Sequence, residues 1–474
     1  MFCIRKNRSP FSRDLKTTDS GPRHVGRTPA LANQDGYAAY LVLSLLVIIA
    51  FLLNAIILGY GRHRKSVETY RKKIQTGFIV TAAEEYVQYL MNTPDGLDYL
   101  LSTPEIRKEL DSESGFSVSV TRKGCFLECG MEARYGTQTR KINRVIGQRH
   151  TDLNNSALFV FGGMSGLILG GNATIEGNVH LPSGSVNTSS QGYFTYRGGV
   201  PMQGKVVQDS RAHDFFIDKR LALLEVRNAQ RCLARVKAGV QTSGHVPASV
   251  FSQANTLYEH GGDVNLDNSM DLDLNGGTLV VSGNVRLNGN SAIRDGTLYA
   301  NGEVELKDRS CLTSMIVCVK NGMRAYNESS LKGQFITPAG ISVNNYTKGL
   351  NFTLLLADSS LWPNAGSARS SITIMDRAEV HGVVVYSAES EQRDIRFTLG
   401  EGAMVDGFVY CAGSAEIRGS VLGQAWTSSF ACMYNRTVHG GIMMDGKILS
   451  SKQDWQTFMP PLFGVEKELA FYEK

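Results

Sequence analysis

The sequence is poor in proline, tryptophan and charge. Among its 474 residues only 12 are proline, three are tryptophan and 20% are charged, whereas 42% are hydrophobic and 49 are glycine. These proportions exclude a disordered chain, a collagen-like chain and a polytopic membrane protein. The formal net charge of +5 arises in the N-terminal region. The rest of the chain lacks the basic excess of a nucleic-acid-binding protein, so no nucleic-acid partner is expected.

The usual sequence signatures of catalysis are missing as well. The nine histidines form no HxxxH or HExxH pair, and there is neither a glycine-rich phosphate loop nor a Gly-x-Ser-x-Gly elbow. A zinc site, a nucleotide site and a serine-hydrolase site therefore lack support. His180, His381 and His439 are predicted at solvent-facing strand positions or turns. We expect a protein that is not an enzyme, has no catalytic residues and uses no cofactor.

A long hydrophobic run is present near the N-terminus. The 22 residues from Ala38 to Gly59 carry no charge, which is enough to cross a hydrocarbon core of ~30 Å at ~1.5 Å per residue. A removable signal sequence has a shorter apolar stretch and a shorter leader. We therefore predict a retained transmembrane helix at residues 37–60. Basic residues flank both of its ends, so the positive-inside rule does not fix the orientation.

The helix is predicted to continue beyond the membrane as an amphipathic stalk over residues 61–92. Apolar residues recur every three or four positions and form one stripe on a charged helix. The cluster Asn92 to Gly96 then ends the helix. The stripe comprises Val67, Tyr70, Ile74, Phe78, Ala82, Tyr86 and Leu90.

These features carry a family resemblance. A basic leader at residues 1–36 ends in Gly36, an apolar helix starts at Tyr37, and TAAEEYVQYL stands near the helix end. This pattern resembles the type IV pilins, in particular minor pilins with an AAE motif. The resemblance implies a peptidase processing site between Gly36 and Tyr37 and an apolar helix that packs into a filament core. At the position where major pilins carry a Glu, this chain has Leu41. Some minor pilins also lack the Glu. A plain single-pass anchor is the alternative.

The body of the chain has a repeated β texture. The pattern Gly-x-Val-x-Leu begins at Gly177, Gly262, Gly283 and Gly302, and the pattern Ala-x-[Ile/Val]-x-Gly-x-Val begins at Ala173, Ala378, Ala403 and Ala415. Short strands with inward-pointing alternate residues and glycine at the corners predict stacked coils of ~20 residues, because one coil cannot bury its own inner face. The expected fold class is mainly β, a β-solenoid preceded by the long helix. A glycine-rich β-sandwich is the rival. The second pattern also resembles the polymer-forming bactofilins.

The expected domain order after the stalk has three parts. A small mixed region covers residues 93–156, and the solenoid covers residues 157–432 with a helical insertion at about 214–238. A C-terminal cap follows at residues 433–474, where Trp455, Phe458 and Pro460 are placed to cover the last coil.

Two local patterns are weighed as sites. Asp271, Asp273 and Asn275 match the first half of a calcium loop, but position twelve is Ser282 instead of Glu, so a half-buried strand that enters an Asn-Gly turn is the favoured interpretation. Otherwise no metal is expected. Cys125 and Cys129 form a C-x₃-C pair, either a local disulfide or two ordinary thiols.

Together these patterns predict a single-pass membrane protein with a structural role. The N-terminus is expected in the cytoplasm and the body in the periplasm or outside the cell. Expected partners are the membrane, a pilus-like or other envelope assembly, and further copies of the chain. One alternative is a membrane-tethered, bactofilin-like polymer in the cytoplasm. Another is a surface β-helix that binds or modifies carbohydrate.

Overall fold

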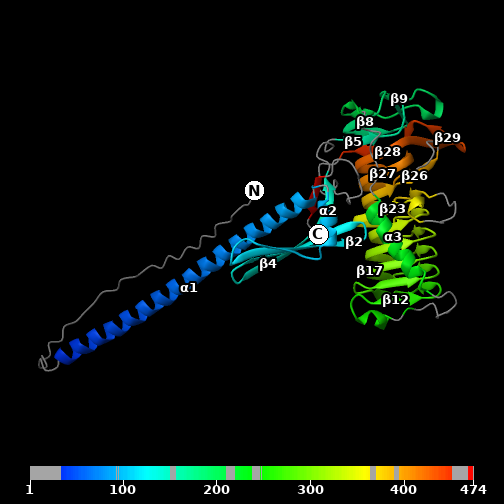
Figure 1. The fold of residues 1–474 in the computed structure, drawn as a ribbon. Coiled ribbons are helices and arrows are strands. Elements are labelled where there is room, and N and C mark those ends of the chain that lie inside the picture. The colour runs from blue at the N-terminus through cyan, green and yellow to red at the C-terminus, as the bar shows by residue number, and fades with distance from the viewer. Residues whose placement is uncertain are drawn as a thin grey trace, which may run out of the picture. The chain divides into compact units, whose positions relative to one another are not determined.

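A computed structural model of the chain describes residues 34–91, 93, 95–149, 156–209, 219–236, 246, 248–362, 370–388, 394–450 and 468–472. The chain divides into two compact units, residues 1–71 and 72–474. Strands account for 48% of the structure and helices for 23%. The predicted fold class is confirmed: a parallel β-solenoid and one long apolar N-terminal helix (Figure 1).

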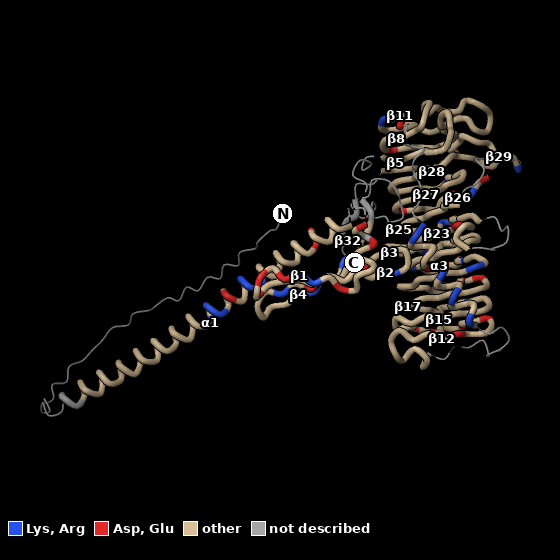
Figure 2. The backbone as a smooth tube through the Cα atoms, in the orientation of Figure 1, with Lys and Arg blue, Asp and Glu red and all other residues tan. Residues whose placement is uncertain are grey.

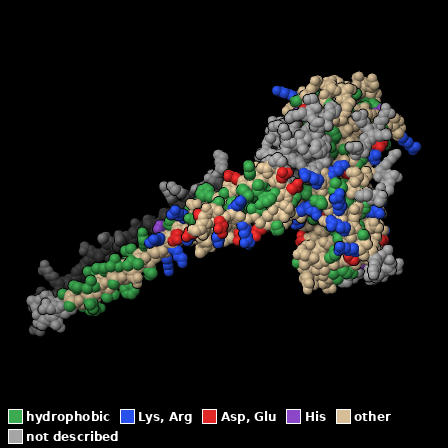
Figure 3. All heavy atoms as spheres, viewed as in Figure 1, with side chains coloured by type: hydrophobic (Ala, Val, Ile, Leu, Met, Phe, Trp, Pro, Cys, Tyr) green, Lys and Arg blue, Asp and Glu red, His purple; other side chains and the backbone are tan. Residues whose placement is uncertain are grey.

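The described part of the first unit is the N-terminal part of helix α1 (Gln34–Met91). Large apolar side chains from Tyr37 to Tyr60 are exposed, and no charged residue interrupts this stretch (Figures 2 and 3). It is the one helix of the described residues that is long and apolar enough to cross a membrane. A surface of this kind is stable only in lipid or against other apolar helices, because water does not solvate it favourably.

The C-terminal part of α1 belongs to the second unit, where it packs on a small antiparallel sheet. The sheet order is β1-β2-β3-β4-β32, and the short helix α2 (Gly96–Ser102) precedes it. Buried residues of α1 and of the sheet form one cluster. A two-layer arrangement of this kind buries the apolar face of both elements. The strands are β1 (Ile106–Glu109), β2 (Ser114–Lys123), β3 (Phe126–Tyr135), β4 (Gln138–Arg149) and β32 (Glu468–Tyr472).

The predicted apolar stripe of the stalk is offset from the buried one. Ile79, Val80, Ala83, Val87 and Met91 are buried against the sheet. The predicted stripe residue Phe78 is 64% exposed, Ile74 is 40% exposed, and Tyr86 and Leu90 lie at the edge of the cluster. The prediction was wrong by about one position because two apolar stripes lie side by side on this helix, and only the fit to the sheet decides between them.

Three sheets of short parallel strands form the solenoid. The first is the face that carries helix α3. It contains β12 (Leu257–His260), β15 (Thr278–Val281), the later parts of β17 (Ala292–Ala300), β19 (Cys311–Val319), β21 (Ser330–Thr337), β23 (Lys348–Ala357) and β25 (Glu379–Tyr386), the middle of β27 (Met404–Ile417) and β28 (Ser420–Tyr434), then β5 (Ser156–Val160), β8 (Asn178–Leu181) and β11 (Val206–Gln208).

The other two faces repeat the same stacking. The second contains β13 (Val264–Leu266), β16 (Val285–Leu287), β18 (Val304–Leu306), β20 (Met323–Ala325), β22 (Ile341–Val343), β24 (Ile372–Ile374) and β26 (Ile395–Leu399), with β30 (Ile442–Met444), β6 (Leu167–Gly170) and β9 (Val186–Thr188) as a separate sheet. The third contains β14 (Asp271–Asp273), the first parts of β17, β19, β21, β23, β25, β27 and β28, and then β31 (Lys447–Leu449), β7 (Thr174–Glu176) and β10 (Met202–Gln203). The strand β29 (Thr437–Gly440) forms a hairpin with β28.

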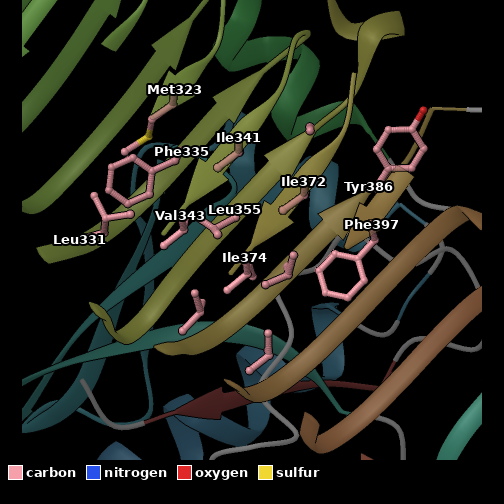
Figure 4. Close-up of a cluster of buried hydrophobic side chains, with 14 of the residues drawn as sticks. Met323, Leu331, Phe335, Ile341, Val343, Leu355, Ile372, Ile374, Tyr386 and Phe397 are labelled. Carbon is pink, nitrogen blue, oxygen red and sulfur yellow. The ribbon is translucent and has the colours of Figure 1, made fainter. Parts of the chain in front are cut away.

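The interior of the coils is filled with aliphatic and aromatic side chains. Figure 4 shows Leu331, Phe335, Leu355 and Phe397 pointing from different sheets into this shared core. Each coil contributes only a few such residues, so the core becomes continuous only through stacking. Val264, Val285 and Val304 of the first repeat pattern stack in register, as predicted.

Glycine in the second pattern marks a corner where coils approach closely. Gly382 and Gly407 have φ of 155° and 145°, and a Cβ on Gly407 would lie 2.0 Å from the carbonyl oxygen of Gly382. Only glycine fits such a position. The copies at Ala173, Ala378 and Ala403 occupy this same corner, whereas the copy at Ala415 lies one face earlier in its coil.

The coils do not stack in chain order. The body begins with β5 to β11, after which the chain passes through α3 (Arg220–Leu233) to the coil of β12 at the other end of the solenoid. It then winds back until β28 pairs with β5, so the last full coil lies against the first strand. Figure 1 shows α3 beside the stack and β5 next to β28.

The two ends of the body differ from the predicted plan. Solenoid strands continue to Leu449, beyond residue 432, and β32 joins the small sheet. The proposed cap residues Trp455, Phe458 and Pro460 lie outside the described residues. At the end of the stack formed by β12 to β14, the 3-10 helix η4 (Ala248–Ser252) places Phe251 in the solenoid core.

Candidate functional site

One face of the solenoid is apolar on its outside as well as its inside. An in-register column of outward residues runs along the first sheet. Strands that are covered on both sides read as continuous hydrophobic runs, which explains sequences such as GVVVY. The column comprises Val280, Tyr299, Cys318, Ile336, Leu356, Val385, Tyr410, Trp426 and Phe159, and every one of them belongs to the same buried cluster.

Two elements cover part of this column. Helix α3 packs Ala222, Val226 and Ala229 against it, and the tip of the β2–β3 hairpin adds Cys125 and Phe126. The amphipathic sequence of α3 produces one apolar face for this contact. The small sheet and the solenoid are therefore joined through a shared apolar cluster.

Buried polar contacts fix the hairpin and the helix in place. The side chain of Gln334 accepts a hydrogen bond from the backbone nitrogen of Cys125 (2.6 Å) and donates one to the carbonyl oxygen of Lys123 (2.8 Å). Tyr299 donates to Glu225 of α3 (2.6 Å), and Arg122 of the hairpin lies 3.3 Å from the same carboxylate. Burial, and then the Glu225 carboxylate, raise the pKa of Tyr299, so its hydroxyl stays protonated and donates.

A buried ion pair holds the start of α3. Lys219 lies 2.6 Å from Asp358, whose side chain is fully buried and also accepts hydrogen bonds from Ser360 and Ser387. A buried carboxylate needs such partners, because its desolvation is costly. The pair therefore fastens α3 to the solenoid at one defined position.

Two neighbouring cavities lie between the hairpin and a corner of the solenoid. Their volumes are about 710 Å³ and about 390 Å³, and both are lined by Lys123, Glu128, Asp295, Ser314 and Ile316. We call this continuous space the hairpin groove. Each of the two cavities has a volume in the range of small-molecule sites.

The predicted calcium residues lie beside this groove in the arrangement expected of a strand and turn. Leu272 and Leu274 are buried, and Asn275 and Gly276 form the turn with φ of 48° and 75°. Asp271 lies 3.0 Å from Arg294, and Asp273 accepts a hydrogen bond from the backbone of Asn275 (2.8 Å). The strand interpretation is confirmed. No group of three acidic, histidine or cysteine side chains suited to a metal occurs among the described residues.

The two candidate disulfide cysteines are free thiols that face different clusters. Cys125 packs against the solenoid, whereas Cys129 packs between the small sheet and α1. The structure therefore does not contain the local disulfide that the C-x₃-C spacing suggested, and the alternative of two ordinary thiols holds. Burial raises the pKa of the Cys129 thiol to about 12 and that of Cys125 further still.

The candidate processing site lies within helical backbone. Gly36 and Tyr37 are in the first turns of α1, and the side chain of Tyr37 is exposed.

A Ser-His-Asp row occurs in the coils that contain β5, β8 and β11. The hydroxyl of Ser156 lies 2.8 Å from Nε2 of His180, and Nδ1 of His180 lies 3.4 Å from a carboxylate oxygen of Asp209. This is the order of a catalytic triad. Ser156 is only 2% exposed, however, so a substrate does not reach its hydroxyl, and the row is best described as a buried polar contact between coils.

Sequence reasoning missed this row and misplaced one of its members. His180 is buried, contrary to the predicted solvent-facing position, whereas His381 is half-buried and lies 3.0 Å from Asp406. The members of the row are 24 and 29 residues apart. Because the coils differ in length, no fixed spacing reveals such a contact.

No protein-family model matches the chain, and no curated protein or solved structure is significantly similar to it.

Proposed function

We propose that this chain is a non-enzymatic structural protein held in a membrane by a single helix. In this proposal the N-terminus is cytoplasmic, the body lies outside, and the protein is a pilin-like accessory of a surface filament or secretion assembly. The single observation that carries the proposal is the exposed, uncharged surface of α1 from Tyr37 to Tyr60. Only lipid or other apolar helices cover such a surface favourably.

The rest of α1 supports the pilin-like form of the proposal. Ala83 and Val87 are completely buried under the small sheet, so the C-terminal part of the helix is an integral part of the folded second unit. The unbroken helix from the apolar stretch to Met91 fits the resemblance of residues 20–92 to minor pilins. A helix whose C-terminal part is packed in the body suits a subunit that is held in an assembly through the N-terminal part of the same helix.

The body supports a structural role through its continuous packing. One continuous core of buried side chains runs along the whole stack, from Val179 of β8 near one end to Leu266 of β13 at the other end. Interiors packed in this way transmit strain and deform little. A stiff, stacked body is suited to spacing or displaying surfaces, which is the role we assign to it.

Labelling of one surface cysteine in intact cells tests the location of the body. Most native thiols after the span are buried, and Cys232 and Cys311 are the two partly exposed ones among the described residues. We therefore combine Cys232→Ser and Cys311→Ser with Thr437→Cys, at an exposed position. A membrane-impermeant maleimide should label this variant in intact cells. It should not label the control chain that carries Cys232→Ser and Cys311→Ser but keeps Thr437. Labelling only after permeabilisation would overturn the outward placement.

Mass spectrometry of the purified chain tests the pilin-like part separately. Processing should yield an N-terminus at Tyr37, and Gly36→Ile should retain the leader because the bulky side chain blocks a glycine-specific site. An intact leader in the parent chain would reject the pilin-like role and leave the single-pass anchor in place.

A further inference from the structure

The hairpin groove has two main walls of different origin, and α3 adds Glu225 and Asn228 to the lining of the larger cavity. One wall is the β2–β3 hairpin, with Lys123, Phe126 and Glu128, and the other is the corner between the third and first faces of the solenoid. Gln334 closes the contact between the walls through its two hydrogen bonds to the hairpin. The groove is therefore a defined feature of the folded second unit.

The solenoid wall carries an unusual row of backbone conformations. Asn275, Asp295, Ser314 and Phe352 have φ of 48°, 48°, 57° and 67°, and all four line the groove. Ser314 and Phe352 are extra residues at breaks in the strand register. Bulges of this kind re-aim a side chain, and they are frequent beside functional sites.

This conformation is energetically costly for Phe352 in particular. A bulky residue at positive φ is an outlier, and the left-handed conformation costs about 1–2 kcal/mol per non-glycine residue. Phe352 is also 42% exposed, so the cost is not offset by full burial of its ring. Such strain persists where the surroundings or a function require it.

The charge of the groove disfavours a polyanion. Arg122 is paired with Glu225, and Lys123 lies 3.6 Å from Glu128. Asp273 and Asp295 have no ion-pair partner among the described residues of the groove. Three basic and four acidic side chains line the two cavities, namely Arg122, Lys123, Lys332, Glu128, Glu225, Asp273 and Asp295.

The uncharged lining consists of hydrogen-bonding groups beside apolar surface. Asn228, Asn255 and Thr297 line the larger cavity, and Phe126, Val145 and Phe352 line the smaller one. Amides, hydroxyls and carboxylates accept and donate hydrogen bonds to hydroxyl groups. An exposed aromatic ring offers a flat face to the apolar side of a sugar ring.

We propose that the hairpin groove binds a neutral, polyhydroxylated chain, an oligosaccharide, along the row from Asn275 to Phe352. Neighbouring coils are ~4.8 Å apart, a spacing of the same order as one pyranose ring in an extended glycan. The repeated corner thus presents a periodic wall to a periodic ligand. This inference does not depend on the orientation of the body or on processing at Gly36.

Calorimetric titration of the full chain tests the proposal. The protein is kept in a detergent whose head group is not a sugar, and chitohexaose, maltohexaose and polygalacturonate are the probes. Asp295→Gly with Phe352→Gly removes two groove side chains, and glycine accepts the left-handed backbone, so the fold is preserved. Asp376→Gly is the matched control, because Asp376 has φ of 55° at a different corner of the solenoid.

We expect saturable binding of at least one neutral hexamer, at least tenfold weaker in the double variant and unchanged in Asp376→Gly. Binding of neither hexamer would overturn the proposal. Equal weakening by the groove variant and the control, or preferential binding of polygalacturonate, would overturn it as well. Circular dichroism and thermal unfolding of each variant show that a loss of binding is not a loss of folding.

Discussion

The small antiparallel sheet and the solenoid solve the same packing problem in opposite ways. The small sheet has one buried face, and its core is completed by α1, as in the contact cluster that contains Val87 of α1 and Met131 of β3. The solenoid closes on itself, so its inner faces supply their own core. Its first face carries a second apolar surface on the outside, part of which α3 and the hairpin cover. The small sheet therefore depends on one partner, whereas each solenoid coil depends on its neighbours.

The sharpest way to separate the two regions is to remove a core side chain from each. Phe335→Ala should destabilise the solenoid by about 3–5 kcal/mol, and Met131→Ala should cost the small sheet about 2–3 kcal/mol, because the one-sided contact with α1 collapses more readily. Hydrogen exchange followed by mass spectrometry should show loss of protection in many coils for Phe335→Ala. Protection lost only in β1 to β4 by that variant would contradict the comparison.

The ion pair at the start of α3 tests how firmly the outer surface is covered. Lys219→Met should cost about 3 kcal/mol, the lower end for breaking a buried pair, because Asp358 keeps its serine partners. Urea unfolding measures this loss. The double variant Lys219→Met with Asp358→Asn should be less destabilised than the single variant, since it leaves no uncompensated charge. An equal or larger loss in the double variant would show that the carboxylate is stabilised without Lys219.

The hydrogen bonds of Gln334 connect the two regions. Gln334→Leu should cost about 1–3 kcal/mol, because it leaves the buried backbone nitrogen of Cys125 without its acceptor. Faster exchange should appear at the tip of the β2–β3 hairpin and not in the solenoid interior. Gln424→Leu, at the same register position four coils along the stack, is the comparison variant.

Alkaline pH should weaken both regions through one buried thiol in each. Burial raises the pKa of Cys129 in the small sheet and of Cys411 in the solenoid to about 12. An unfolded thiol ionises near ~8.5, so unfolding releases a proton above that pH and stability falls as pH rises toward 12. Cys129→Ala should flatten the pH dependence of hydrogen exchange in β2 to β4 between pH 8 and 10. An unchanged slope would assign the effect to other groups.

The smallest effect is expected at the exposed apolar stripe of α1, which is the stripe predicted from the sequence. Phe78→Ser should change the stability of the second unit by less than about 0.5 kcal/mol, because the ring is mostly exposed. Ile79→Ser, at the adjacent buried position, should produce a much larger loss in thermal unfolding. Similar losses in both variants would mean that the predicted stripe contacts the sheet after all.

The predictable features were those in which one physical constraint recurs along the chain. Valine and leucine alternate around Val285 and Val304 because every coil has the same inner face, so the repeat revealed the solenoid. The apolar run after Tyr37 likewise predicted the long, exposed apolar helix. The order of the coils was hidden, because any coil presents similar strand edges and the pairing of β28 with β5 leaves no mark in either sequence.

The candidate site was less predictable for a related reason. The Asn275-Gly276 turn has a known sequence signature, and it was found. Ser314 and Phe352 have no such signature, since their left-handed backbone is imposed by neighbouring coils. The choice between Phe78 and Ile79 also depended on the shape of the sheet, which hydrophobic spacing alone does not encode.

The pairing of β5 with β28 has a mechanical consequence. The chain leaves β4 for β5 and returns from β31 toward β32, and both β5 and β31 lie within the stack, with neighbouring strands on either side. A tensile load applied through α1 would therefore reach the solenoid at an interior coil. To yield, that coil must lose two rows of hydrogen bonds at once, whereas a strand at a free end would peel away one row at a time.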